Sequence, residues 1–133
     1  MEDRPILRKL ATELQSGRTI EEIIELSGEM EKLMTYYKCA MYEVETKFRV
    51  LNEQLSLGKS RNPIESIKTR LKSIQSIQGK LHKLGVSSSC KSIEDNLSDV
   101  AGVRVICCYL DDIYMLADCL LQQDDVTLIR KII

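Results

Sequence analysis

The feature that most constrains the fold is an apolar stripe whose members recur alternately four and three residues apart. This spacing places them on one side of a single helix and predicts a helix over 20–55, about 54 Å long. The stripe consists of Met30, Met34, Tyr37, Met41, Val44, Phe48, Leu51 and Leu55. Such a helix extends beyond the core of a small domain, so we expect a homo-oligomer that forms through helices. Packing along the rest of the same domain is the alternative.

The ends of this helix carry local signals. Thr19 followed by Glu22 fits a capping box at its start. A short amphipathic helix over Pro5–Gln15 is expected before it, because Ser16-Gly17 is a helix-stop signal. A loop at residues 57–63 follows the long helix. We therefore expect N-terminal helices over 1–56 and a separate folded part over 57–133.

Residues 66–72 alternate between apolar and polar side chains, which is typical of a strand. The polar face of this strand is entirely cationic and consists of Lys68, Arg70 and Lys72, with Ile67, Thr69 and Leu71 on the other face. Ser73 then fits the cap of a helix that ends at Gly85. The expected core positions of that helix are Ile74, Ile77, Leu81 and Leu84.

The remaining segments also alternate between the two kinds of element. A helical turn is expected over 92–97, and the apolar run 100–109 predicts a central strand that is buried on both faces. Asp111 is placed to cap a helix to Gln123, and residues 125–130 suggest one more strand. The fold class is therefore α+β, with a small sheet flanked by helices and preceded by the long helix.

Composition excludes several classes of protein. The chain has 133 residues, enough for one domain, and 19 basic against 20 acidic residues give a net charge of −1. A uniformly basic nucleic-acid binder is thereby excluded, so no specific DNA partner is expected. No signal peptide and no apolar run of about 18 residues occur, which indicates a cytoplasmic protein without a membrane partner. The five cysteines form no Cys-x-x-Cys pair, and His82 is the only histidine. A disulfide framework and a zinc site are therefore not expected.

Charge is segregated along the chain. Between residues 59 and 83 there is a single acidic residue, Glu65, against seven cations, which are Lys59, Arg61, Lys68, Arg70, Lys72, Lys80 and Lys83. Such a block is often no more than solvated surface. It is also what a polyphosphate pocket needs, because several negative oxygens must be neutralised at once.

Arg104 stands inside the apolar run and is costly to bury without an anion. It could pair with Asp99 or Glu65, which is a structural role. Alternatively it could join the cationic strand in a nucleotide-triphosphate pocket, with Asp99 holding Mg²⁺ on the phosphates. No glycine-rich Walker loop is present, so a P-loop enzyme is not favoured.

Several spaced motifs resemble one family. Residues 61–72, then Ser76 and Lys80, then residues 99–107 and 111–114 look like the first part of the RelA/SpoT-type synthetase domain, most of all in small alarmone synthetases (GTP pyrophosphokinases). The resemblance implies a nucleotidyltransferase-like mixed sheet. It also implies transfer of the β,γ-pyrophosphate of ATP to the 3′-hydroxyl of GTP or GDP, giving (p)ppGpp in the stringent response.

The resemblance also implies roles for individual residues. Those that match ATP contacts of the family are Arg70, Lys72, Ser76, Lys80, Lys83 and Arg104. Arg70 and Arg104 match the pair that stacks on the adenine, and Asp99 matches a Mg²⁺ ligand. We expect the cationic strand and helix faces to converge on one pocket.

Two family segments are absent, namely the one that stacks the acceptor guanine and the one that supplies a second, catalytic carboxylate. We therefore expect a domain truncated at its C-terminus, with no complete catalytic set, which carries the ATP side and is inactive alone. The other readings are a non-catalytic nucleotide-binding module and a chain that associates with other subunits through its long helix.

Overall fold

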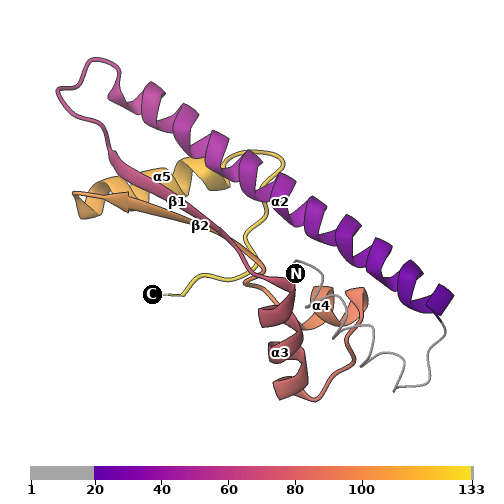
Figure 1. Cartoon of the computed structure of the whole chain (residues 1–133). Coiled ribbons are helices and arrows are strands. Elements are labelled where there is room, and N and C mark those ends of the chain that lie inside the picture. Colours follow the sequence, from indigo (N-terminus) through magenta and orange to yellow (C-terminus); the bar gives the residue numbers. More distant parts are fainter. Residues whose placement is uncertain (1–19, 133) are drawn as a thin grey trace. The chain divides into compact units, whose positions relative to one another are not determined.

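The computed structural model describes residues 20–132, with side chains from residue 26 onwards. Its elements, in chain order, are α2 (Ile20–Ser56), β1 (Ile64–Leu71), α3 (Ile74–Leu84), α4 (Cys90–Asn96), β2 (Ala101–Cys107) and α5 (Leu110–Leu121) (Figure 1). They form two compact units, one of residues 20–36 with 73–98 and the other of residues 37–72 with 99–132. The short helix expected over Pro5–Gln15 and the capping box at Thr19 lie outside the described side chains. The expected boundary at residue 56 stays a prediction.

Helix α2 confirms the prediction made from the apolar stripe. Met30, Met41 and Leu51 are buried, and the other five members of the stripe are half-buried. The helix ends at Ser56, where Gly58 adopts the left-handed backbone conformation with φ 75°. Apolar side chains on one side of α2 are thus withdrawn from water, as the spacing requires. No helix in the described part of the chain is both long and apolar enough to cross a membrane.

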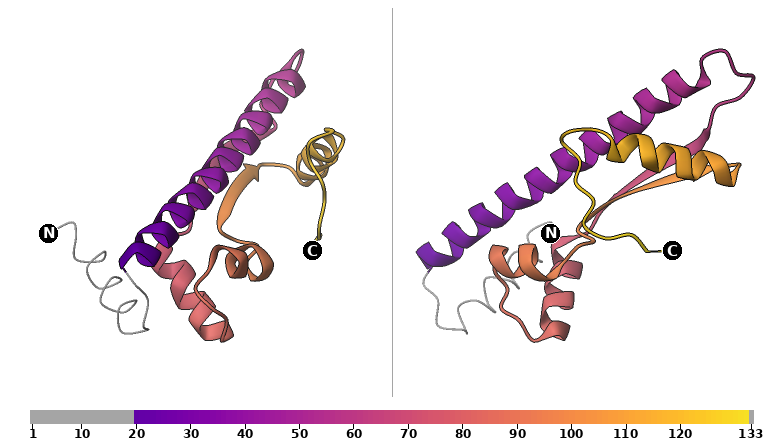
Figure 2. Two further views of the ribbon diagram at one scale, coloured as in Figure 1. Left: turned by 90° about the vertical axis from the view of Figure 1, so that its right-hand side faces the viewer. Right: turned by 180° about the vertical axis from the view of Figure 1, so that it is seen from behind.

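Strands β1 and β2 pair antiparallel and form a two-stranded sheet (Figures 1 and 2). The register places Lys68 opposite Arg104, Arg70 opposite Gly102 and Thr69 opposite Val103. Directly opposed residues of an antiparallel pair lie on the same face of the sheet. The predicted strand is confirmed with bounds Ile64–Leu71, but Thr69 is exposed like Lys68 and Arg70, and Lys72 lies beyond the end of the strand. The α+β fold with a small sheet and a long preceding helix is confirmed.

One face of this sheet is covered by the second half of α2 and by α5. Leu51, Ile64 and Leu116 form the buried centre of the cluster. The half-buried side chains around it are Phe48, Leu55, Ile67, Val105, Cys107 and Cys119. We call this the covered face, and the opposite one, which carries Lys68, Arg70 and Arg104, the open face. Removal of apolar surface from water on the covered face stabilises this unit by about 25 cal/mol per Å².

Helix α3 has the predicted bounds. The Ser73 side chain accepts a hydrogen bond from the Ser76 amide at its start, and Gly85 takes the left-handed conformation with φ 71° at its end. Ile77 and Leu81 are fully buried, as is Ile93 of α4. The prediction that Ile74 and Leu84 face the core is wrong, because these two side chains at the helix ends are 38% and 51% exposed.

Three further expectations are wrong. Strand β2 is not buried on both faces, since it has one neighbouring strand among the described residues and Gly102 and Arg104 are exposed. Tyr109, and not Asp111, occupies the N-cap of α5. Residues 125–130 form no strand, because no described strand pairs with them. The chain there is held by a side chain instead, since Lys47 Nζ donates to Asp125 Oδ1 at 2.9 Å.

Candidate nucleotide-binding site

The open face of the β1–β2 sheet gathers cations from both strands. Lys68 and Arg104 are cross-strand partners, and Arg70 is two residues further along β1 on the same face. All three side chains are exposed, and none has a hydrogen bond or ion pair with a described residue. Like charges placed directly opposite one another are destabilising. The face therefore holds positive charge that nothing in the described part of the chain neutralises.

The two arginines of this face are diagonal neighbours. Arg70 is opposite Gly102, and Arg104 is two residues beyond Gly102. Diagonal neighbours in an antiparallel pair lie about 7–8 Å apart. A flat ring in contact with a planar group on each of its faces needs about 3.5–4 Å per contact, which gives the same total. The register therefore places the backbone positions of the two arginines close enough for their side chains to reach both faces of one flat ring.

Lys72 and Asp99 are joined by an ion pair next to this face. Lys72 Nζ donates to Asp99 Oδ2 at 2.8 Å, and the Lys72 amide donates to the carbonyl of Val100 at 2.7 Å. The Lys72 side chain is 14% exposed and that of Asp99 is 51% exposed. Arg104 pairs with neither Asp99 nor Glu65, which was the structural alternative. Asp99 forms an ion pair with Lys72 instead, and Glu65 accepts a hydrogen bond from Cys108.

The surroundings of Asp99 are compatible with a magnesium ligand. It is half-exposed and so accessible to an ion from solvent, and no group of three possible metal-ligating side chains occurs in the described part of the chain. Mg²⁺ is commonly held by one or two carboxylates together with substrate phosphates and water. A single carboxylate beside a cationic face fits that donor set, provided that a bound nucleotide supplies the other oxygens.

The predicted site residues of α3 belong to the other unit. Ser76 and Lys83 are exposed and Lys80 is half-buried. Ser73 Oγ donates to Ser76 Oγ at 3.0 Å, so the first turn of α3 fixes the Ser76 hydroxyl. The structure thus brings Arg70, Lys72, Asp99 and Arg104 together, while Ser76, Lys80 and Lys83 form a second set on α3.

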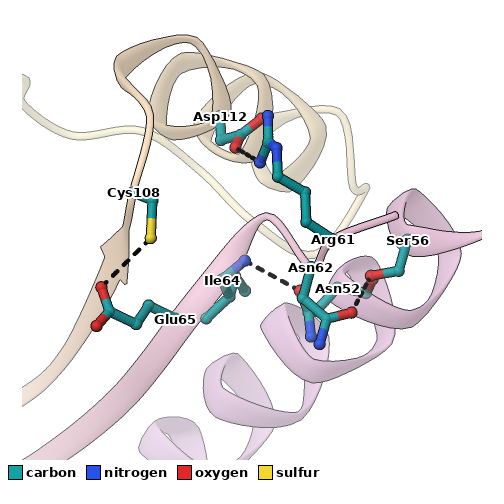
Figure 3. Close-up of polar contacts among 8 residues, drawn as sticks. All are labelled: Asn52, Ser56, Arg61, Asn62, Ile64, Glu65, Cys108 and Asp112. Carbon is teal, nitrogen blue, oxygen red and sulfur yellow. Dashed lines mark hydrogen bonds and ion pairs between the residues drawn. The ribbon is translucent and has the colours of Figure 1, made fainter. Parts of the chain in front are cut away.

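The structure also shows a contact that the motifs did not predict. Arg61 forms an ion pair with Asp112, which is 6% exposed (Figure 3). The Arg61 guanidinium also lies over the Tyr109 ring, at 4.0 Å from the centroid. The hydrogen bond that Arg61 donates to the Asp112 carboxylate raises the pKa of Arg61. Two further contacts fix the same loop. Ser56 Oγ donates to Asn62 Oδ1 at 2.7 Å, and the Ile64 amide donates to Asn52 Oδ1 at 3.0 Å.

These contacts anchor the loop before β1 to the first turn of α5 and to the end of α2. Because they hold the start of β1, they help to set which of its residues face outward. The only feature of the sequence that pointed to Arg61 and Asp112 is that both lie within the motif segments. Nothing local indicated that the two residues pair across 51 positions.

Comparisons with known proteins show what the chain is similar to. Residues 69–131 match the region found in RelA / SpoT proteins. GTP pyrophosphokinase YwaC of Bacillus subtilis (strain 168) is 36% identical over 94 residues, which cover 71% of this chain and 45% of that protein. The small alarmone synthetase 2 of Bacillus subtilis aligns with a TM-score of 0.64 at 33% identity, over 77% of this chain and 50% of the other.

The small alarmone synthetase 1 of Bacillus subtilis was solved in two bound forms that also resemble this chain. The form bound to its product pppGpp aligns with a TM-score of 0.63 at 26% identity, over 73% of this chain and 48% of the other. The form bound to AMPCPP aligns with a TM-score of 0.62 at 26% identity, over 74% and 51%. The chain spans about half the length of the relatives that it matches.

The fold and the sequence matches together define a GTP pyrophosphokinase-like chain. Residues 69–131 of the chain carry the region found in RelA / SpoT proteins, and the chain resembles small alarmone synthetases over about half of their length.

Proposed function

We propose that this chain binds ATP on the open face of its sheet and supplies the donor side of (p)ppGpp synthesis. In that reaction the β,γ-pyrophosphate of ATP moves to the 3′-hydroxyl of GTP or GDP. The observation that carries the proposal is the set of Lys68, Arg70 and Arg104, three exposed cations on one face with no described anionic partner. The relatives named GTP pyrophosphokinase and the relative bound to AMPCPP, an ATP analogue, support this ligand class.

The proposed roles follow from the chemistry of each side chain. Arg70 and Arg104 stack on the adenine, which uses planar guanidinium groups that lysine could not replace. Lys72 binds phosphate oxygens. Ser76, Lys80 and Lys83 of α3 are proposed as further ATP contacts, on the strength of the family resemblance.

Asp99 would hold Mg²⁺, which when bound supplies charge neutralisation on the phosphates. Lys72 and a cation at Asp99 compete for the same carboxylate, because Lys72 Nζ lies 2.8 Å from Asp99 Oδ2. ATP relieves this competition, since its phosphates offer Lys72 a second anionic partner. Release of Lys72 from Asp99 is therefore coupled to nucleotide binding in this proposal.

Pyrophosphoryl transfer asks a protein chiefly for positioning and charge stabilisation. The residues above orient the donor and neutralise it, but they include no group proposed to activate the acceptor hydroxyl. We therefore propose that the 133-residue chain binds ATP without transferring pyrophosphate by itself. Incubation with ATP, GTP and Mg²⁺ tests this part, and clear (p)ppGpp production would overturn it. Cytoplasmic location stays a prediction.

Calorimetric titration with ATP and Mg²⁺ tests the binding site. Arg70→Glu should weaken ATP affinity by at least about tenfold, because it removes a stacking partner and places a carboxylate on the open face. Arg49→Glu is the matched control, since Arg49 is an exposed arginine of α2 whose partner is Glu45 at 3.4 Å. Unchanged affinity in Arg70→Glu would show that the site is wrongly assigned.

Association through α2 is the second candidate, and two exposed apolar side chains favour it. Tyr42 and Val50 of α2 are 50% and 49% exposed. Met41 and Phe48 are also apolar residues of α2, but they belong to the stripe that packs within the chain. Changes at these two positions would therefore affect folding and would not test association. A double change of Tyr42 and Val50 to serine should dissociate a helix-mediated oligomer in sedimentation experiments and leave ATP affinity unchanged. A monomeric wild-type chain would exclude this candidate.

A further inference from the structure

Neither the backbone conformation nor the packing of β2 requires a glycine at position 102. Its φ is not in the left-handed region, so its backbone would accept any residue. A Cβ built at this position would meet no atom within 4 Å, so close packing does not require glycine either. Glycine inside a strand weakens it, and it often marks a point where a ligand approaches the backbone closely.

Gly102 lies next to the two arginines that are proposed to bind the adenine of ATP. It lies directly opposite Arg70, and Arg104 is the next residue on the same face of β2. On the β2 side the floor between the two arginines is therefore bare backbone, whereas on the β1 side Lys68 lies between them. Any side chain at position 102 would project from the open face, next to the positions of Arg70 and Arg104.

We propose that Gly102 is the floor of a slot for a purine base, and that its missing side chain determines whether the base can enter. This inference rests on the proposed function, since it names the part of the ATP site that receives the adenine. The bare floor lets the ring slide between Arg70 and Arg104 until its edge meets the main chain of β2. Phosphate binding involves the neighbouring cations and does not depend on this position.

The test compares two ligands on the 133-residue chain. ATP has a base and phosphates, whereas inorganic tripolyphosphate has phosphates alone. Gly102→Val should weaken ATP affinity by at least about tenfold, because its branched side chain fills the slot. Its affinity for tripolyphosphate should stay within about twofold of wild type. Its thermal unfolding temperature should not fall, since valine favours strands.

Ser66→Val is the matched control. Ser66 is on the same face of β1, paired with Ile106, and lies beyond the Lys68–Arg104 pair. This variant gains the same side chain outside the slot, so it should bind both ligands as wild type does. If Gly102→Val does not fold, Gly102→Ala decides, with an expected loss of ATP affinity of about twofold or more and no loss for tripolyphosphate.

The outcomes separate this inference from the proposed function. If Gly102→Val binds ATP normally while Arg70→Glu does not, the slot assignment is overturned and the ATP site stands. If Gly102→Val loses ATP and tripolyphosphate equally, the slot assignment is overturned as well, because the change acts on the whole face. If the wild-type chain binds tripolyphosphate but shows no preference for ATP, the proposed adenine site and the slot both fall.

Discussion

The two faces of the β1–β2 sheet are built from alternate residues of the same strands, yet they obey opposite rules. On the covered face Ile67 and Val105 are paired and pack on the cluster around Leu51 and Leu116. On the open face the adjacent pair is Lys68 and Arg104, two cations that repel each other across the strands. One face therefore lowers the free energy of the folded chain, and the other raises it.

This difference separates the face that stabilises the chain from the face that we propose binds a ligand. A face selected only for solubility would mix charges of both signs, because cross-strand ion pairs stabilise a sheet. The open face instead keeps three cations together and places a glycine among them. An anion would offset the repulsion, so the cost in stability becomes a gain in affinity for a polyphosphate ligand.

The largest effect is expected on the covered side. Leu116 of α5 is 2% exposed and lies at the centre of the cluster under the sheet. Leu116→Ala should lower the free energy of unfolding by about 2–5 kcal/mol, because it removes buried methyl groups and leaves a cavity. Urea unfolding followed by circular dichroism measures this.

Leu121→Ala is the matched control, since Leu121 is on the same helix and is 38% exposed. It should cost less than about 1 kcal/mol. Nucleotide affinity of the folded fraction should be unchanged in both variants. Equal losses of stability would mean that Leu116 is not at the centre of the core.

The open face should respond in the opposite way to a charge reversal. Lys68→Glu places a carboxylate opposite Arg104, which should raise the free energy of unfolding by about 0.2–1 kcal/mol. The same change should weaken ATP affinity by about two- to tenfold, because it engages Arg104 and lowers the positive charge of the face. Lys68→Gln, which cannot form the ion pair, should show a smaller loss of affinity and little change in stability.

Thermal unfolding and calorimetry at low and high salt distinguish these effects, because surface ion pairs are screened by salt. A variant that gains stability and loses affinity would support the contrast between the faces. Tighter ATP binding by Lys68→Glu would refute it.

Elements with local signals could be predicted from the sequence. Helix α3 has the expected bounds because Ser73 and Gly85 act on backbone groups within one turn. The open face of β1 could also be predicted, since alternation is a property of the strand itself. The strand expected over residues 125–130 could not be, because a strand needs a partner and Lys47 holds this segment from 78 positions away.

The candidate site could be predicted only in part, because some of its residues carry local signals and others depend on tertiary structure. Arg70 and Arg104 could be predicted as site residues, because both are arginines at the positions that the motifs require. That Gly102 lies between them depends on the register of two strands that are distant in the sequence. The Arg61–Asp112 pair depends on how the loop before β1 meets α5. Side-chain pairs of this kind follow from tertiary structure and leave no periodic pattern.

The smallest effect is expected where the alternation of β1 is interrupted. The register shifts between Ile64 and Ser66, and Glu65 there accepts a hydrogen bond from Cys108 Sγ at 3.5 Å (Figure 3). This hydrogen bond raises the pKa of the Cys108 thiol. A thiol with a raised pKa stays protonated at pH values where the unfolded chain already forms thiolate. The contribution to stability is therefore complete below the unfolded pKa and is lost as the pH rises through the folded pKa.

Glu65→Gln removes the charge that disfavours the thiolate, so the pKa of Cys108 should fall and its alkylation at pH 8.5 should accelerate. The increase should stay below about tenfold, because a thiolate of lower pKa is also a weaker nucleophile. Iodoacetamide labelling with mass spectrometry of each cysteine measures the rate, and Cys39 on exposed α2 is the internal control. Equal acceleration at Cys39 and Cys108 would indicate general loosening of the fold. A change confined to Cys108 would show that Glu65 affects the Cys108 thiol alone. Glu65 would then belong neither to the covered face, which stabilises the chain, nor to the open face, which is proposed to bind the ligand.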